Sequence, residues 1–199
     1  MNAPRAEVHA LILAAGASRR FGAAKQLARI DGEPLLVRVA RRAAAAADRS
    51  WVILGAHANE LAPLLAHAPV TVRINARWSE GLASSIRAGI QYLPPSCDAV
   101  MLVLADQALI STREYAGLAQ AWRDAPHSIA AAGHGPRSGA PAIFPRRLFA
   151  ELGHLHGDVG ARSLLEHHAS EVLTVPMPSA AFDLDTPDDL ASLVNSTIG

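Results

Sequence analysis

The sequence is poor in cysteine, in aromatic residues and in net charge. Cys97 is the only cysteine among 199 residues, so an internal disulfide is excluded, which is typical of proteins in a reducing compartment. Lysine and arginine together number 18, as do aspartate and glutamate, so the net charge is zero. This balance argues against a nucleic-acid groove or an anionic membrane surface as the main partner.

Long apolar runs are also missing. The longest is far shorter than the roughly 20 residues of a membrane helix, and the first five residues, MNAPR, are not followed by the apolar core of a secretory signal. We therefore expect a cytoplasmic protein with no membrane partner. A chain of this length corresponds to one domain, which we expect to cover residues 1–199.

Two common phosphate-binding motifs are absent after the first apolar run, residues 8–13, which predicts a buried strand. The following glycines, Gly16 and Gly22, are six positions apart, so the segment does not have the spacing of a P-loop. Position 18 is serine rather than glycine, so the G-x-G-x-x-G fingerprint of dinucleotide-binding folds is absent too. This second absence disfavours an NAD(P)-dependent oxidoreductase.

The loop after this strand is instead made of small and basic residues. Alanines, glycine and serine at positions 14–18 leave backbone N–H groups accessible, and Arg19, Arg20 and Lys25 add positive charge. Small residues, backbone donors and cations after a first strand suit a polyphosphate ligand. The residues alone also allow an ordinary strand-to-helix turn with solvated cations.

Strand and helix patterns alternate in the first half of the chain. Residues 34–47 and 59–66 have helical patterns, whereas 51–54 and 70–74 read as short strands. This βαβαβ order predicts a parallel sheet with helices on its faces.

The most apolar strand pattern, residues 99–104, ends at Asp106. We expect this strand to be central. A carboxylate at the carboxyl end of such a strand lies at the ligand crevice of parallel sheets and suits Mg²⁺ bound to phosphates. A turn or helix-capping role for Asp106 is equally consistent with its position.

The second half predicts a helix capped by Ser111, an irregular loop at residues 133–139 and a short strand at 140–144. Asp183 and Asp185 alternate with apolar residues, so we expect both on one side of a strand. Thr186 has the position of a helix N-cap.

The stretch LILAAGASRRFGAAK resembles the signature L-A-A/G-G-x-S-x-R-M/L-G-x-x-K of the nucleotidyltransferases that make the nucleotide form of molybdenum cofactor. Residues 78–89 resemble a second block of that family, W-x-x-G-L/M-x-x-S-I/L-x-x-G, and residues 183–189 its closing motif, D-I/L-D-T-P-E/D-D. The chain departs from the family pattern at Phe21, at Ala108 in place of proline, and at Ala140 in place of histidine.

The resemblance implies a three-layer α/β/α Rossmann-like fold with a mostly parallel sheet. It implies that residues 1–110 bind the NTP and that residues 111–199 bind the acceptor. The activity that it implies is that of a molybdenum cofactor cytidylyltransferase, which transfers CMP from CTP to the terminal phosphate of molybdopterin. Ala15, within L-A-A-G, favours CTP because guanylyl enzymes more often have L-A-G-G. The partners implied are CTP or another NTP, a molybdopterin-type phosphorylated acceptor and a client molybdoenzyme.

The resemblance also assigns roles to residues. Arg20 and Lys25 would offset triphosphate charge, and Asp106 and Asp185 would bind Mg²⁺. The nucleotide-binding residues are Leu13, Ala14, Ala15, Gly16, Ala17, Ser18, Gly81, Ser84 and Ser85.

Residues 157–165, GDVGARSLL, resemble the family segment that faces the second substrate. Arg162 would then meet a phosphate or the pterin. With equal weight, Asp158 is a helix cap and Arg162 belongs to a surface ion pair.

Two other functions remain open at this level. One is a nucleotidyltransferase of the same fold that uses GTP or another phosphorylated acceptor. The other is a non-catalytic nucleotide-binding protein that assists molybdoenzyme maturation.

Overall fold

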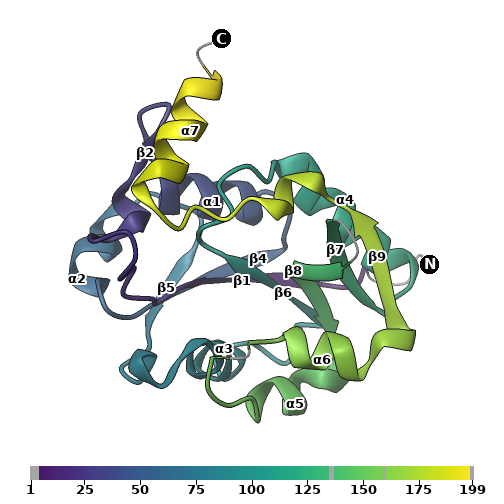
Figure 1. The fold of residues 1–199 in the computed structure, drawn as a ribbon. Coiled ribbons are helices and arrows are strands. Elements are labelled where there is room, and N and C mark those ends of the chain that lie inside the picture. Colours follow the sequence, from purple (N-terminus) through teal and green to yellow (C-terminus); the bar gives the residue numbers. More distant parts are fainter. Residues whose placement is uncertain (1–4, 135–136, 159, 198–199) are drawn as a thin grey trace.

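The structure is a computed structural model that describes residues 5–134, 137–158 and 160–197. Its centre is a seven-stranded sheet in the order β5-β4-β1-β6-β8-β7-β9 (Figure 1). Every neighbouring pair is parallel except those of β8, which runs antiparallel to β6 and β7, so the predicted mostly parallel sheet is confirmed. The strands are β1 (Val8–Ala14), β4 (Arg49–Leu54), β5 (Thr71–Ile74), β6 (Ala99–Leu104), β7 (Ile129–His134), β8 (Arg137–Pro145) and β9 (Val172–Pro176), with β2 (Arg29–Ile30) and β3 (Glu33–Pro34) in a separate pair.

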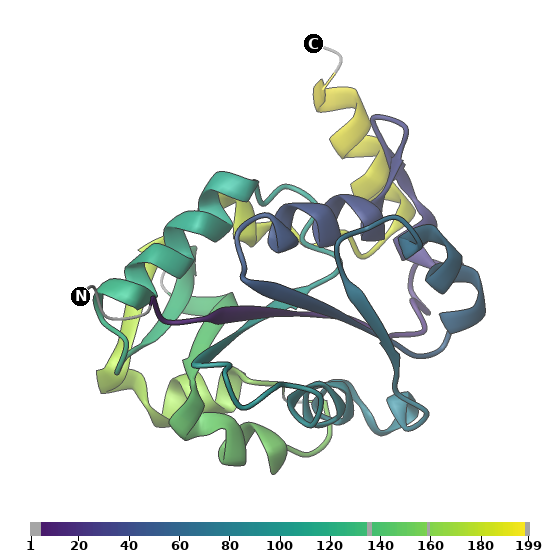
Figure 2. The ribbon, with the colours of Figure 1, turned by 180° about the vertical axis from the view of Figure 1, so that it is seen from behind.

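Helices cover both faces of the sheet, as Figures 1 and 2 show from opposite sides. One face carries α1 (Leu35–Ala44), α2 (Ala58–Leu61), α4 (Thr112–Asp124) and α7 (Pro187–Thr197), and the other carries α3 (Leu82–Ile90), α5 (Phe149–Gly153) and α6 (Arg162–His167). The expected three-layer arrangement is therefore confirmed. Among the described residues, no helix is long and apolar enough to cross a membrane.

Strand β1 shows why the sheet needs both helical layers. Its alternate side chains Val8, Ala10 and Ile12 pack into the core beneath α1 and α4, whereas Leu11 and Leu13 pack against the α3 side. All of these side chains are at least nine-tenths buried. A strand buried on both faces has an unbroken apolar sequence rather than an alternating one, as residues 10–14 do.

Local sequence signals place two helices that support the site. Ser111 caps α4 and forms a reciprocal capping box with Glu114, which confirms the predicted cap. Helix α3 lies very close to β1, because a Cβ atom at Gly89 would be 2.3 Å from a methyl carbon of Leu11. A larger residue at position 89 would therefore push α3 away from the middle of β1.

The predicted loop at 133–139 is wrong where the structure describes it. Strands β7 and β8 form an antiparallel hairpin in which Gly133 pairs with Ser138 and His134 with Arg137; the connection, Gly135 and Pro136, lies outside the described residues. A register shift between Ala131 and Ala132 interrupts the ladder. The glycines suggested a loop, but cross-strand pairing outweighs their low strand propensity.

Candidate functional site

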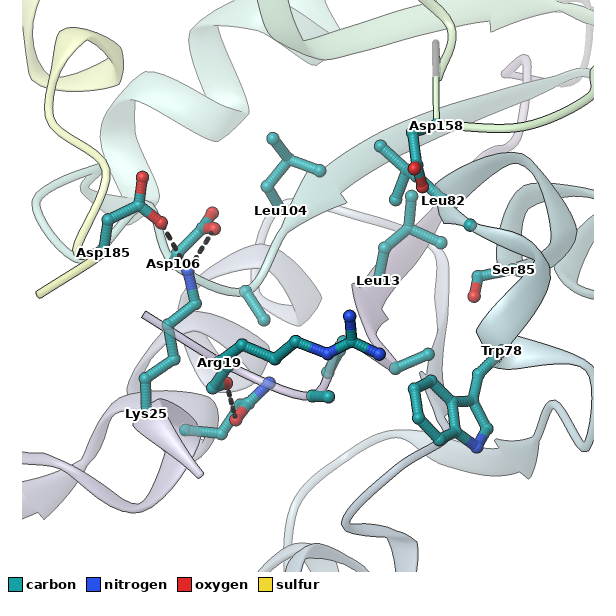
Figure 3. A pocket seen from close by; sticks show the side chains of 18 of the residues that line it. Leu13, Arg19, Lys25, Trp78, Leu82, Ser85, Leu104, Asp106, Asp158 and Asp185 are labelled. Carbon is teal, nitrogen blue, oxygen red and sulfur yellow. Dashed lines mark hydrogen bonds and ion pairs between the residues drawn. The ribbon is translucent and has the colours of Figure 1, made fainter. Parts of the chain in front are cut away.

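A cavity of about 470 Å³ opens at the carboxyl ends of β1 and β6 (Figure 3). Ligands bind in this position in open α/β sheets, because the loops after the parallel strands meet there. Segments far apart in the chain contribute to its wall. The lining residues are Leu13 to Arg20, Lys25, Gln26, Trp78, Ser79, Gly81, Leu82, Ser85, Leu104, Ala105, Asp106, Asp158 and Asp185.

The loop after β1 lines this cavity. Two of its carbonyl groups have partners elsewhere, because Ala15 O accepts from the N–H of Ala56 and Ala17 O lies 3.3 Å from His57 Nε2. Within the described part of the chain, no N–H group from Gly16 to Arg20 donates a hydrogen bond. A run of unpaired N–H groups is a binding site for an anion.

The two acids predicted to act together do meet, and Lys25 lies between them. The Lys25 Nζ atom donates to Asp106 Oδ2 at 2.8 Å and to Asp185 Oδ1 at 2.9 Å (Figure 3). Burial alone lowers the pKa of Lys25, but the charges and hydrogen bonds of the two carboxylates outweigh it and raise the pKa above its ordinary value. Lys25 is also the only lysine in the chain, and at neutral pH it is a cation.

The closing segment, residues 183–189, holds Asp185 in place without forming a strand. The Leu184 N–H donates to the carbonyl of Asp106 at 3.0 Å, which joins this segment to the end of β6. The Asp189 carboxylate accepts from the N–H groups of Asp185 and Thr186, and the Thr186 hydroxyl accepts from the Asp189 N–H. The Thr186 cap is therefore confirmed, whereas the predicted strand is wrong because the capping bonds take the backbone donors.

Asp183 differs from Asp185 in its placement. The residue as a whole is exposed and does not line the cavity. The protein around its carboxylate removes part of the hydration of that group, and this effect, followed by the charges of Asp106 and Asp185, raises its pKa. Of Asp106, Asp183 and Asp185, only Asp106 and Asp185 therefore line the cavity.

Two residues that sequence reasoning missed hold the Asp106 turn. The buried Gln107 side chain donates to the carbonyls of Ala140, at 2.9 Å, and Ala180, at 3.2 Å. The Arg42 guanidinium, from α1, donates to the carbonyls of Ala108 and Ile110. The helical pattern of residues 34–47 did not indicate this contact, and only the tertiary fold reveals the partners of Arg42.

Arginines line the side of the cavity next to Lys25. Arg20 Nη2 lies 3.0 Å from Asp185 Oδ2, with the arginine side chain 74% exposed. Arg19 extends into the cavity between Lys25 and Trp78 (Figure 3). Both residues are exposed, and their guanidinium groups can donate charged hydrogen bonds to the oxygens of a bound polyphosphate.

The opposite end of the cavity is less charged. Trp78, Gly81, Leu82 and Ser85 line it, as the second sequence block predicted for Gly81 and Ser85. Ser84 does not line it: its hydroxyl is buried, donates to the carbonyl of Gly81 at 2.8 Å and accepts from Asn75.

Arg162 lies at a different cavity, of about 340 Å³, beside β8, β9 and α6. Its Nε atom forms an ion pair with Glu166 at 3.1 Å. Asp158 is not a helix cap, since α6 begins at Arg162 with Ala161 at the N-cap and no side-chain capping bond. The structure therefore separates Asp158, in the first cavity, from Arg162, in the second.

The donor set fits a hard divalent cation. Asp106 Oδ1 is buried without a hydrogen-bond partner among the described residues, although its other oxygen is bound by Lys25. No group of three or more His, Cys, Asp or Glu side chains in the described ranges has the arrangement of a metal site. Mg²⁺ commonly uses one or two carboxylates and completes its shell with waters and substrate phosphates, so Asp106 and Asp185 suffice as protein ligands.

Comparison with known proteins identifies the family of the chain. Residues 10–172 match the model of the MobA-like NTP transferase domain family. A probable molybdenum cofactor guanylyltransferase of Nostoc sp. is 27% identical over 92% of this chain and 88% of its own length. One from Synechococcus elongatus is 58% identical over 43 residues, which cover 22% of each protein.

Among solved structures, Rv0371c of Mycobacterium tuberculosis in complex with manganese superposes with a TM-score of 0.78. It is 25% identical, and the match covers 96% of this chain and 99% of that one.

Proposed function

The chain belongs to the MobA-like NTP transferase domain family, and from this premise we propose that it transfers a nucleotidyl group from an NTP to the terminal phosphate of molybdopterin, with release of pyrophosphate. One observation carries the proposal: a loop with unpaired N–H groups, Lys25 and two carboxylates line one cavity. The acceptor is supported by relatives that are named probable molybdenum cofactor guanylyltransferases.

The proposed reaction needs no covalent enzyme intermediate. An oxygen of the acceptor phosphate bonds to the α-phosphorus, and the bond from that phosphorus to the bridging oxygen of the β-phosphate breaks. The residues act by positioning and by offsetting charge, which are the main contributions to catalysis at phosphorus. Backbone N–H groups at 16–20 bind phosphate oxygens, while Lys25 and Arg20 offset the charge that develops on pyrophosphate.

We propose Mg²⁺ as the cation, held by Asp106 and Asp185. When bound, such an ion neutralises phosphate oxygens and makes the α-phosphorus more electrophilic. The manganese complex of the mycobacterial structure supports a divalent ion in this fold. In the protein alone, Lys25 occupies the position between the two carboxylates, so we expect its ammonium to move toward phosphate when nucleotide and cation bind.

The two halves of the chain share this site. Asp158 and Asp185 belong to residues 111–199, yet they line a cavity otherwise formed by residues 1–110. We propose that the first half supplies most of the contacts to the NTP and that the second presents the acceptor to the same cavity. Arg162, at the second cavity, is a candidate contact for a remote part of the acceptor.

For the base we propose cytosine. Ala15, the residue that resembles cytidylyl enzymes, lines the cavity and is buried against Gly55. The choice of cytosine therefore depends on the resemblance of the L-A-A-G sequence to cytidylyl enzymes. GTP is the second candidate, because the relatives are named probable molybdenum cofactor guanylyltransferases.

A turnover assay tests this function directly. The protein would be supplied with Mg²⁺, molybdopterin and CTP, GTP or ATP in turn, and pyrophosphate and the dinucleotide product would be measured. We expect pyrophosphate release that requires the acceptor and is fastest with CTP. A preference for GTP would overturn the choice of base, release only with other phosphorylated acceptors would overturn the acceptor, and binding without any turnover would favour a non-catalytic accessory protein.

A further inference from the structure

Asp158 is the one carboxylate in the cavity lining whose role the proposed reaction leaves open. In the described part of the chain its carboxylate has no hydrogen-bond or ion-pair partner, whereas Asp106 and Asp185 are both bound by Lys25. Asp158 lies at the end of the cavity away from Lys25 and near Leu82 and Ser85 (Figure 3). A lone negative charge repels phosphate, so it must face a part of the ligand that donates hydrogen bonds.

The position of Asp158 is set by tight backbone contacts. The Ala83 N–H, in the first turn of α3, donates to the carbonyl of Gly157 at 3.1 Å. Gly81 adopts φ +99°, and a Cβ atom there would lie 2.3 Å from Asp158 Oδ1 and 2.7 Å from Gly157 O. The turn at 157–158 therefore lies directly on the backbone of Gly81, and the carboxylate has a defined place in the wall.

The surroundings of Asp158 suit a flat heterocycle. Leu13, Leu82 and the Trp78 ring line this end, and the N–H groups that suit phosphate are at the loop after β1. A nucleotide with its phosphates on that loop and beside Lys25 extends its base toward Trp78 and Asp158. The donors that such a base offers to a carboxylate are its amino and ring N–H groups.

We propose that Asp158 accepts a hydrogen bond from the exocyclic amino group of the base and thereby selects amino-bearing bases. This inference rests on the proposed function, namely that the cavity holds an NTP, but not on the choice between CTP and GTP. Cytosine carries an amino group where uracil carries a carbonyl oxygen, and guanine carries one that hypoxanthine lacks. A carboxylate bonds to the cytosine amino group and repels the uracil carbonyl, and it bonds to the guanine amino group that hypoxanthine lacks, so the site discriminates within each pair.

Equilibrium binding without acceptor tests the inference apart from catalysis. Affinities for CTP, UTP, GTP and ITP would be measured with Mg²⁺ for the wild type, Asp158→Asn and Asp158→Ala. In whichever pair the wild type binds, the amino-bearing nucleotide should bind about 10- to 100-fold more tightly, as expected for a hydrogen bond to a charged group. Asp124→Asn is the matched control, because Asp124 bonds to Gln120 on α4 and does not line the cavity.

The two variants give different expected results. In Asp158→Asn the neutral amide accepts from the cytosine amino group or donates to the uracil carbonyl, so a preference for CTP over UTP should fall to within about threefold. A preference for GTP over ITP should weaken, because the acceptor loses its charge. In Asp158→Ala the amino-bearing nucleotide should bind more weakly, with no gain for its partner. A wild-type preference retained in both variants contradicts the role of Asp158, as does a change confined to the KM of the acceptor, whereas a wild type that binds none of the four nucleotides contradicts the proposed function itself.

Discussion

Replacing Asp106 with asparagine is expected to lower nucleotidyl transfer at least about a thousandfold, in the range seen when a charge-stabilising group is removed from a water-excluded site. The substitution keeps the shape of the side chain and the backbone bond from Leu184 to the carbonyl of Asp106. It removes the negative charge of Asp106, which binds Lys25 and would bind the proposed cation. Asp185→Asn should have a similar effect, because Asp185 contacts the same ammonium group.

Pyrophosphate release at saturating nucleotide, together with thermal unfolding, measures both effects. We expect unfolding midpoints close to wild type, since both carboxylates face the cavity and are partly solvated. Asp124→Asn should retain full turnover. Near-normal turnover in both cavity variants would remove the two carboxylates from the mechanism.

Lys25→Ala is expected to lower turnover by about two to three orders of magnitude, since a cation at a buried phosphate site contributes several kcal/mol. In the protein alone, the variant also leaves Asp106 and Asp185 facing each other without their shared cation, so it should unfold more readily than wild type at neutral pH. The raised pKa of Lys25 means that its ion pairs stabilise the fold fully below its ordinary pKa of 10.5. That contribution is lost only as the pH rises through the higher pKa of the folded state.

Lys25→Arg is the matched variant for this test. It keeps the positive charge but changes the donor geometry from a point charge to a planar fork, so stability should recover more than turnover does. Because Lys25 is the only lysine, amine-reactive labelling of the wild type modifies it and the N-terminus alone, and bound NTP should protect it. Full turnover of Lys25→Ala, or labelling of Lys25 that NTP does not slow, would contradict its proposed contact with phosphate.

The sequence predicted those parts of the fold and site that depend on local signals. The βαβ order and the Ser111 and Thr186 caps follow from periodicity and capping chemistry, whereas the joint roles of Lys25, Asp106 and Asp185 were implied by the resemblance to the family. The predictions failed where distant contacts decide the structure. Arg42, on α1, donates to a carbonyl of the turn after Asp106. The Gln107 side chain donates to carbonyls at residues 140 and 180, which are far away in the sequence.

The same explanation applies to the wrong element assignments. The β7–β8 hairpin is stabilised by pairing that its glycine-rich sequence did not signal. The closing segment is not a strand because Asp189, four positions after Asp185, binds the donors that a strand would use. Ser84 is turned toward Asn75 by the geometry of the first turn of α3, which spacing alone does not define.

The most direct test of the account is a crystal structure with Mn²⁺ and a non-hydrolysable CTP analogue, in which anomalous scattering locates the ion. The account predicts the ion at the carboxylates of Asp106 and Asp185, with the triphosphate on the N–H groups at 16–20 and the Lys25 ammonium on phosphate oxygens. An ion bound away from these two carboxylates, or a triphosphate in the cavity beside Arg162, would contradict it.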